Sequence, residues 1–156
     1  MRTLTGELDK GNYFYNGGSW IEDEDELTLR AVYHMLDSLP FVIELDTIHG
    51  KYGLVHGDVN STYWDVFIRE LETKANAIDA AIWGRGRITR LISTEISGID
   101  KVFLGHTIVE VPTKLGNTYY IDTGSFLNNG GITFWDVKED RFHYVGNREH
   151  ESDYAD

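Results

Sequence analysis

The feature that most constrains the fold is a short apolar run that ends in a glycine and a histidine. Residues 101–107 read Lys-Val-Phe-Leu-Gly-His-Thr. A continuous apolar run of this length, bounded by turn residues, is typical of a strand that is covered on both faces. In α/β proteins the carboxyl ends of such strands carry the chemistry. The run therefore predicts an α/β fold with His106 at a functional edge of a sheet.

A second stretch repeats this pattern. Residues 52–58 read Tyr-Gly-Leu-Val-His-Gly-Asp, so a second buried strand ends in His56, with Asp58 two residues later. One histidine beside a glycine is most often a turn residue, but two strands that end in the same way indicate a pair. Neutral imidazoles with a nearby carboxylate suit a divalent metal such as Mn²⁺, Fe or Zn²⁺.

Further polar groups are predicted at the same edge. Arg85 stands between two glycines, where the backbone can bend and a ligand can approach closely. An arginine held there can grip a phosphate or a carboxylate with two parallel hydrogen bonds. Thr107 follows His106, and Asp122 ends a predicted strand over residues 118–124. A metal, an arginine and an anion together are the arrangement expected for phosphoester hydrolysis.

The other elements follow from hydrophobic periodicity and turn residues. An acidic run at residues 22–26 begins a helix over residues 25–38, and Pro40 ends it. Residues 1–20 are rich in turn residues, and the Asn-Gly-Gly run at residues 16–18 predicts a loop with positive φ. We expect an antiparallel hairpin from residues 41–45 and 52–56. One helix is predicted from Trp64 to Ala75, a second carries Ile88 to Ile96, and residues 132–137 and 141–145 form another hairpin.

Composition limits the classes of partner. The 156 residues predict one domain, and the net charge of −12 argues against binding to nucleic acid or to an anionic membrane. The absence of cysteine excludes disulfides and thiolate metal sites. No apolar run is long enough to cross a membrane, and the first residues do not read as a signal peptide, so we expect a cytoplasmic protein. His143 is expected at the surface, and residues 147–156 as a flexible tail.

The order of these motifs resembles the C-terminal portion of the lambda-type bacteriophage serine/threonine protein phosphatases, which are metallophosphoesterases. The resemblance rests on residues 55–58, Trp83-Gly84-Arg85, residues 103–107 and residues 120–124, and extends back to residues 16–20. It implies an α/β/β/α sandwich with mixed sheets. It also implies that His56 and His106 bind one metal, Mn²⁺ foremost, of a two-metal centre, that Arg85 contacts the substrate phosphate, and that Asp122 orders the loop after its strand.

The departure from the family is equally specific. The motifs Gly-Asp-x-His-Gly, Gly-Asp-x-x-Asp-Arg-Gly and Gly-Asn-His-Glu, which supply the remaining metal ligands in that family, do not occur here. A two-metal hydrolase holds its ions about 3.5–4 Å apart with ligands between them. We therefore expect residues 1–146 to be a single incomplete domain without its N-terminal half. The isolated chain should then bind metal weakly or not at all and be inactive.

Three functions stay open from the sequence, and whether this chain is an enzyme on its own stays open with them. The first is a phosphatase fragment that acts on phosphorylated proteins or small phosphoesters. The second is a non-catalytic module that binds a metal or an anion, or pairs through an open sheet edge with the missing half or with a second copy. The third is a dinucleoside polyphosphate hydrolase, although Trp83-Gly84-Arg85 favours the protein phosphatase.

Overall fold

The computed structural model describes residues 10–146, which belong to two compact units, one that ends at Pro40 and one that starts at Phe41. Each unit is described by itself. The prediction of a single domain over residues 1–146 stays a prediction. The predicted tail at residues 147–156 lies outside the described residues.

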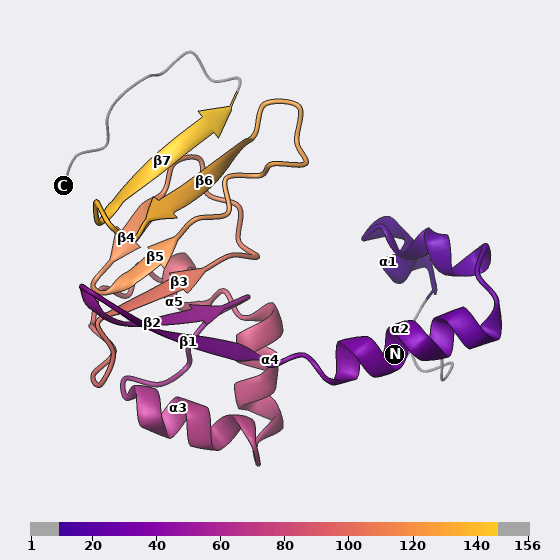
Figure 1. The fold of residues 1–156 in the computed structure, drawn as a ribbon, viewed down its shortest axis with the longest axis horizontal. Coiled ribbons are helices and arrows are strands. Elements are labelled where there is room, and N and C mark those ends of the chain that lie inside the picture. Colours follow the sequence, from indigo (N-terminus) through magenta and orange to yellow (C-terminus); the bar gives the residue numbers. More distant parts are fainter. Residues whose placement is uncertain (1–9, 147–156) are drawn as a thin grey trace. The chain divides into compact units, whose positions relative to one another are not determined.

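From residue 10 onward, where the structure describes it, the first unit contains α1 (Lys10–Tyr15), the 3₁₀ turn η1 (Gly18–Glu22) and α2 (Glu26–Asp37) (Figure 1). The Asp25 carboxylate caps α2 by accepting a hydrogen bond of 2.8 Å from the Thr28 N–H. The predicted helix over residues 25–38 is therefore confirmed. The loop with positive φ predicted at residues 16–18 is confirmed, because Gly17 has a φ of 86° and separates α1 from η1. The helix α1 was not predicted.

A mixed five-stranded sheet forms the centre of the second unit, with the strands in the order β1-β2-β3-β5-β4. The strands are β1 (Val42–Thr47), β2 (Gly50–Val55), β3 (Lys101–Leu104), β4 (Thr113–Leu115) and β5 (Thr118–Tyr120). β2, β3 and β5 run parallel, whereas β1 and β4 pair antiparallel at the two edges. The α/β class and the antiparallel hairpin of β1 and β2 are thus confirmed.

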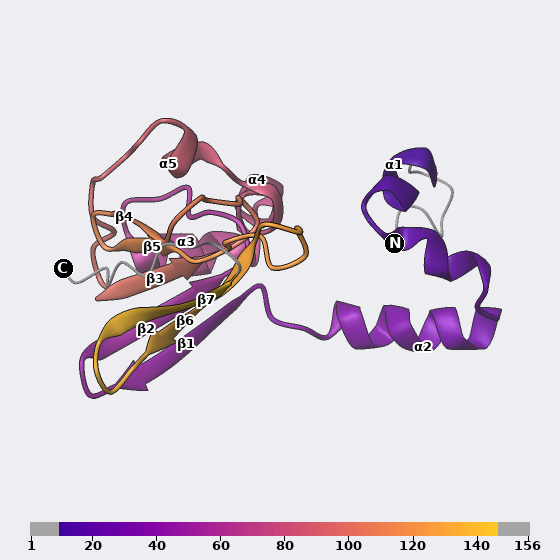
Figure 2. The ribbon, with the colours of Figure 1, turned by 90° about the horizontal axis from the view of Figure 1, so that it is seen from above.

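The two faces of this sheet are covered differently (Figure 2). α3 (Trp64–Leu71), α4 (Ala75–Trp83) and α5 (Gly86–Thr89) lie on one side, where Phe67 and Ala81 pack against Val102 and Leu104. The hairpin of β6 (Gly131–Asp136) and β7 (Arg141–Gly146) lies on the other side. Its Trp135 and Phe142 pack against Tyr52, Phe103 and Tyr119. The complete α/β/β/α sandwich stays a prediction.

Three details of the predicted elements need correction. The helix predicted from Trp64 to Ala75 is two helices, because α3 ends at Leu71 and α4 starts at Ala75. The helix predicted to carry Ile88 to Ile96 is only the four-residue α5, and β4 was not predicted. The chain after α5 is irregular because the buried Asn117 side chain binds its backbone: it accepts from the Ile96 N–H and donates to the Ile96 and Ile99 carbonyls.

Candidate functional site

Two histidines meet where β2 and β3 end. The strands are parallel neighbours with Val55 opposite Leu104, so the residues that follow leave the sheet at the same edge. The His56 and His106 rings lie with their centroids 5.0 Å apart and their planes inclined by 55°. The structure therefore brings together the pair that the sequence pattern predicted.

A tight turn aims the His106 ring. The Gly105 N–H donates to the His56 carbonyl at 3.0 Å, which prolongs the pairing of the two strands by one step. The Thr107 N–H then donates back to the Gly105 carbonyl at 2.6 Å, and His106 between them has a φ of 60°. A side chain other than glycine rarely adopts this left-handed conformation, which costs on the order of 1–3 kcal/mol and is concentrated at functional sites.

The surroundings of His106 keep its imidazole uncharged. Burial lowers the pKa of His106, the Arg85 guanidinium and the His56 ring lower it further, and the Asp122 carboxylate acts in the opposite direction. The neutral form is therefore favoured near pH 7. A neutral imidazole has the free nitrogen lone pair that a metal ion needs.

Arg85 lies across the start of the loop that follows β3. Its Nη1 donates to the His106 carbonyl and to the Thr107 hydroxyl, both at 3.0 Å. Its Nε and Nη2 make no hydrogen bond to any residue that the structure describes. Because the side chain is exposed, these two groups can meet an anion from solvent beside the histidine pair.

Asp58 is a buried carboxylate that joins the His56 loop to the turn that carries Arg85. Its Oδ1 accepts from the Val59 N–H at 2.7 Å, and its Oδ2 accepts from the Arg87 N–H at 2.8 Å. The side chain is 4% exposed. With both oxygens engaged by backbone N–H groups, Asp58 positions the site rather than completing the histidine pair.

Glycines allow this close approach of loop and helix. A Cβ on Gly84 would lie 2.5 Å from the Ala80 carbonyl oxygen and 2.6 Å from the Asp58 Cβ. A Cβ on Gly57 would lie 2.7 Å from the same carbonyl oxygen. The Gly57 and Asp58 N–H groups donate to the Ala81 and Ala80 carbonyls, which fastens the His56 loop to α4.

Asp122, the last predicted site residue, orders its own loop. Its Oδ1 accepts from the Gly124 N–H at 3.1 Å, and its backbone carbonyl accepts from the Val109 N–H at 2.9 Å. The chain leaves β5 beside β3, because the Ile121 N–H donates to the Leu104 carbonyl. All six residues predicted from the sequence, namely His56, Asp58, Arg85, His106, Thr107 and Asp122, thus gather at one end of the sheet. Their functional roles stay predictions.

The sequence pattern predicts no separate role for Trp83. This residue ends α4, is 65% exposed, and its ring meets the His106 ring edge-on at 5.5 Å between centroids. The only signal for it in the sequence was its place two residues before Arg85. Its exposed ring therefore forms part of the surface next to the histidine pair.

The spacing of the histidine rings fits one divalent ion held by both. Imidazole nitrogens at about 2.0–2.1 Å from a shared ion place their ring centres roughly 5 Å apart. In the described part of the chain, however, neither histidine belongs to a set of three His, Asp or Glu ligand atoms that lie within 4.8 Å of one another. The pair therefore supplies an incomplete set of ligands.

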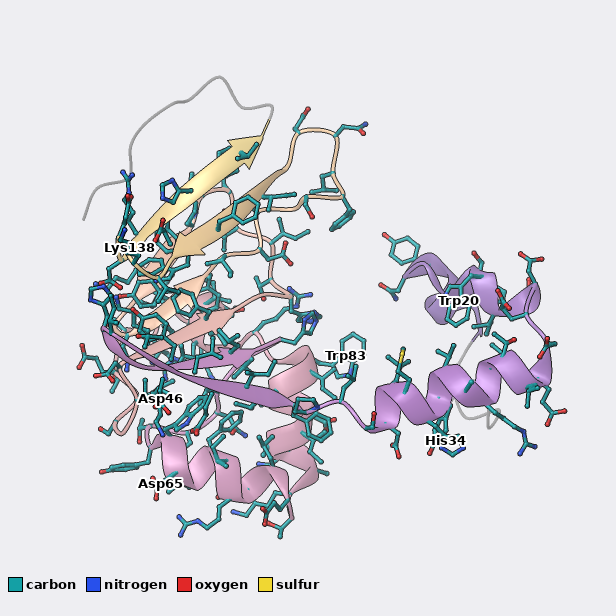
Figure 3. The ribbon with its side chains drawn as sticks, in the orientation of Figure 1. Trp20, His34, Asp46, Asp65, Trp83 and Lys138 are labelled. Carbon is teal, nitrogen blue, oxygen red and sulfur yellow. The ribbon has the colours of Figure 1, made fainter. Side chains whose placement is uncertain are left out.

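Such a set of three does occur at the turn of the β6–β7 hairpin. Asp136, Glu139 and His143 each place one ligand atom within 4.8 Å of the others. This turn contains Lys138 and lies at the other end of the second unit from Trp83 (Figure 3). His143 is 41% exposed, and the Arg141 guanidinium already pairs with Glu139 at 2.6 Å. This cluster shares no residue with the predicted site.

Two curated proteins of Salmonella typhimurium (strain LT2) resemble the chain. Serine/threonine-protein phosphatase 2 is 32% identical over 139 residues, which are 85% of this chain and 61% of that protein. Serine/threonine-protein phosphatase 1 is 28% identical over 118 residues, 72% of this chain and 50% of that protein. The chain thus spans between half and three fifths of the length of these relatives, and no family model matches it. The relatives support a protein phosphatase family. Among the described helices, none has the length and apolarity to cross a membrane.

Proposed function

We propose that the chain carries part of the active site of a metal-dependent serine/threonine phosphoprotein phosphatase. The observation that supports this most directly is the meeting of His56 and His106 at 5.0 Å, with Arg85 bonded to the loop of the second histidine. The similarity to two serine/threonine-protein phosphatases supports phosphoproteins as the class of substrate.

In this proposal His56 and His106 hold one divalent ion, Mn²⁺ foremost. Two imidazoles also suit Fe and Zn²⁺, so the donor atoms alone do not select the metal. When bound, such an ion polarises a phosphoryl oxygen and makes a bound water more acidic. The other ligands have to come from groups outside the histidine pair. We therefore expect the chain alone to bind the ion weakly or not at all, and to be inactive or to show at most slow turnover.

Arg85 binds the phosphate of the substrate. Its Nη1 is held by the His106 carbonyl and Thr107, which fixes the direction of the guanidinium plane. A fixed guanidinium places its remaining N–H groups for a bidentate hydrogen bond to phosphate oxygens. The overall charge of −12 makes this local positive charge necessary for an anionic substrate.

Metal binding is the direct test. Titration of the chain with MnCl₂, followed by the loss of the paramagnetic signal of free Mn²⁺, should show binding that His56→Ala and His106→Ala each abolish. His34→Ala removes an exposed histidine of α2 and is the matched control (Figure 3). Equal Mn²⁺ binding by the wild type and by the double variant of His56 and His106 would contradict the metal assignment.

Catalysis is tested separately. Mn²⁺-dependent hydrolysis of p-nitrophenyl phosphate should be slow for the chain alone and should fall about tenfold or more in Arg85→Ala, because a charge-assisted pair of hydrogen bonds to phosphate is lost. Arg69→Ala removes an exposed arginine of α3 and should leave the rate unchanged. Hydrolysis without metal, or an unchanged rate in Arg85→Ala, would contradict the proposal.

A second candidate is a module that binds without catalysis, and a specific observation favours it. β1 is an edge strand whose alternate side chains Ile43 and Leu45 are 48% and 41% exposed, and Phe41, just before the strand, is 44% exposed. An unpaired apolar edge of this kind invites the addition of another strand. We propose a second polypeptide, or a second copy of the chain, as the partner. Light scattering that shows a strict monomer at all concentrations would count against the second copy.

A further inference from the structure

A hollow of about 570 Å³ opens on the helical side of the sheet, and Asp58 and Trp83 are among the residues that line it. The loop before α3, one face of α4 and the start of α5 surround it. This volume lies in the range of roughly 300–1,000 Å³ that is usual for small-ligand sites. Nothing in the function proposed above uses this hollow.

The hollow shares one wall with the predicted phosphate site. Trp83, Gly84, Gly86 and Arg87 all line it, whereas the Arg85 side chain between them turns to His106 and Thr107. The segment at residues 83–87 therefore has the phosphate-binding arginine on one side and the hollow on the other. Trp83 lines the hollow, and its ring centroid lies 5.5 Å from that of His106, so one side chain connects the hollow to the histidine pair. This distance corresponds to about one to two residues of an extended peptide.

Most of the polar groups at the base of the hollow are engaged within the protein. Both Asp58 oxygens accept backbone N–H groups, and the buried Arg87 donates from Nη2 to the Thr94 carbonyl. The Arg87 Nε is also buried, and it has no hydrogen-bond partner among the described residues. The surface left for a ligand is more apolar than polar, and it includes Trp83, which is 65% exposed. At the rim stand two exposed groups of opposite charge, Asp79 and Arg90, which together favour neither an anion nor a cation.

We propose that the hollow binds an apolar side chain of the phosphoprotein substrate, aromatic foremost, one or two residues from the phosphorylated residue. Trp83 is the specificity-determining residue, because its ring offers a flat apolar face next to the phosphate site. The inference rests on the proposed function and deepens it, since it makes the substrate a peptide with a particular flanking residue rather than a small phosphoester.

The test uses short fluorescent peptides with a central phosphonate analogue of phosphoserine, which cannot be hydrolysed. One peptide has alanine at the two positions on each side, and four others each have phenylalanine at one of these positions. Fluorescence anisotropy with the full chain in MnCl₂ gives their affinities. We expect at least one phenylalanine peptide to bind about tenfold tighter than the alanine peptide, as burial of an aromatic side chain predicts.

The variants are compared by the ratio of phenylalanine to alanine affinities, which is independent of changes common to all peptides. Trp83→Ala should bring this ratio close to one, and Trp83→Phe should preserve most of it. Trp20→Ala removes an exposed tryptophan of the first unit and should leave the ratio at its wild-type value. Circular dichroism checks that each variant is folded, which the 65% exposure of Trp83 favours.

The outcomes separate this inference from the proposed function. If removal of the phosphonate lowers the affinity but the flanking phenylalanine does not raise it, the inference fails and the phosphatase proposal stands. If peptides without the phosphonate bind equally well, the phosphatase proposal fails. Adenosine is tested as a competitor of the phenylalanine peptide. If it displaces this peptide from the wild type and no longer binds to Trp83→Ala, the hollow is a nucleobase site and the peptide inference is overturned.

Discussion

The Asp58 carboxylate accepts a hydrogen bond of 2.8 Å from the backbone N–H of Arg87, across 29 positions of the chain. This one contact joins the loop that carries His56 to the turn that carries Arg85. The position of His56 relative to Arg85 therefore depends on Asp58. In our proposal Asp58 itself contacts neither the metal ion nor the phosphate.

Asp58→Asn should destabilise the protein and weaken phosphate binding together. The amide can accept from only one of the two N–H groups and turns its own N–H₂ toward the other, which leaves a buried donor unpaired. We expect a loss of about 1–3 kcal/mol in the free energy of unfolding, measured by urea denaturation. Asp65→Asn, at an exposed ion pair of α3, should change stability by about 0.5 kcal/mol or less.

Gly84→Ala should lower the stability of the protein much more than Gly105→Ala, although the substitution is the same. The added Cβ at Gly84 would lie 2.5 Å from the Ala80 carbonyl oxygen, so the α4–α5 turn must shift, at a cost of about 1–3 kcal/mol. At Gly105 the nearest atom outside its chain neighbours is the His56 carbonyl oxygen at 3.5 Å, an ordinary contact. Thermal unfolding of both variants checks this; equal melting temperatures would contradict the close packing at Gly84.

Asn117→Ala should be among the most damaging polar substitutions in the second unit. The buried side chain makes three hydrogen bonds of 2.8–2.9 Å to the backbone of Ile96 and Ile99. Their loss leaves one N–H and two carbonyls without these partners, and we expect about 2–4 kcal/mol of destabilisation. Asn60→Ala, which removes one exposed hydrogen bond of 3.2 Å, is the control and should cost well under half as much. Urea denaturation compares the two.

Tyr120 should make the fold sensitive to alkaline pH. Burial, followed by the nearby Asp58 charge, raises the pKa of Tyr120 to about 12 from the model-compound value of 10.0. The folded state therefore keeps a proton that the unfolded state loses above pH 10, so this contribution to stability is complete below pH 10 and disappears as pH rises toward 12. The dependence of the urea midpoint on pH measures it.

Tyr120→Phe is the matched control for that experiment. The Tyr120 hydroxyl is buried and has no hydrogen-bond partner among the residues described, so its removal should be neutral or mildly stabilising near pH 7. The variant should also unfold less readily than the wild type between pH 10 and 12. An unchanged alkaline dependence would show that other groups cause it.

The sequence by itself determined the two strands and their histidines. An apolar run followed by a glycine and a histidine is a local signal, and because it occurs twice in an α/β pattern, it predicted that His56 and His106 share an edge of one sheet. The start of α2 in the acidic run and the antiparallel pairing of β1 with β2 are local in the same sense. The structure bears out all of these elements.

Only the tertiary structure decided how the site is held. The break between α3 and α4, the shortness of α5 and the left-handed turn at His106 depend on partners that are distant in the chain, such as Asn117 for residues 96–99. Asp58 looked like a companion of the metal ligands in the sequence, yet its oxygens are taken by backbone N–H groups, one of them 29 positions away. Periodicity reports which side chains are buried, whereas hydrogen-bond partners across a packed core follow from the fold as a whole.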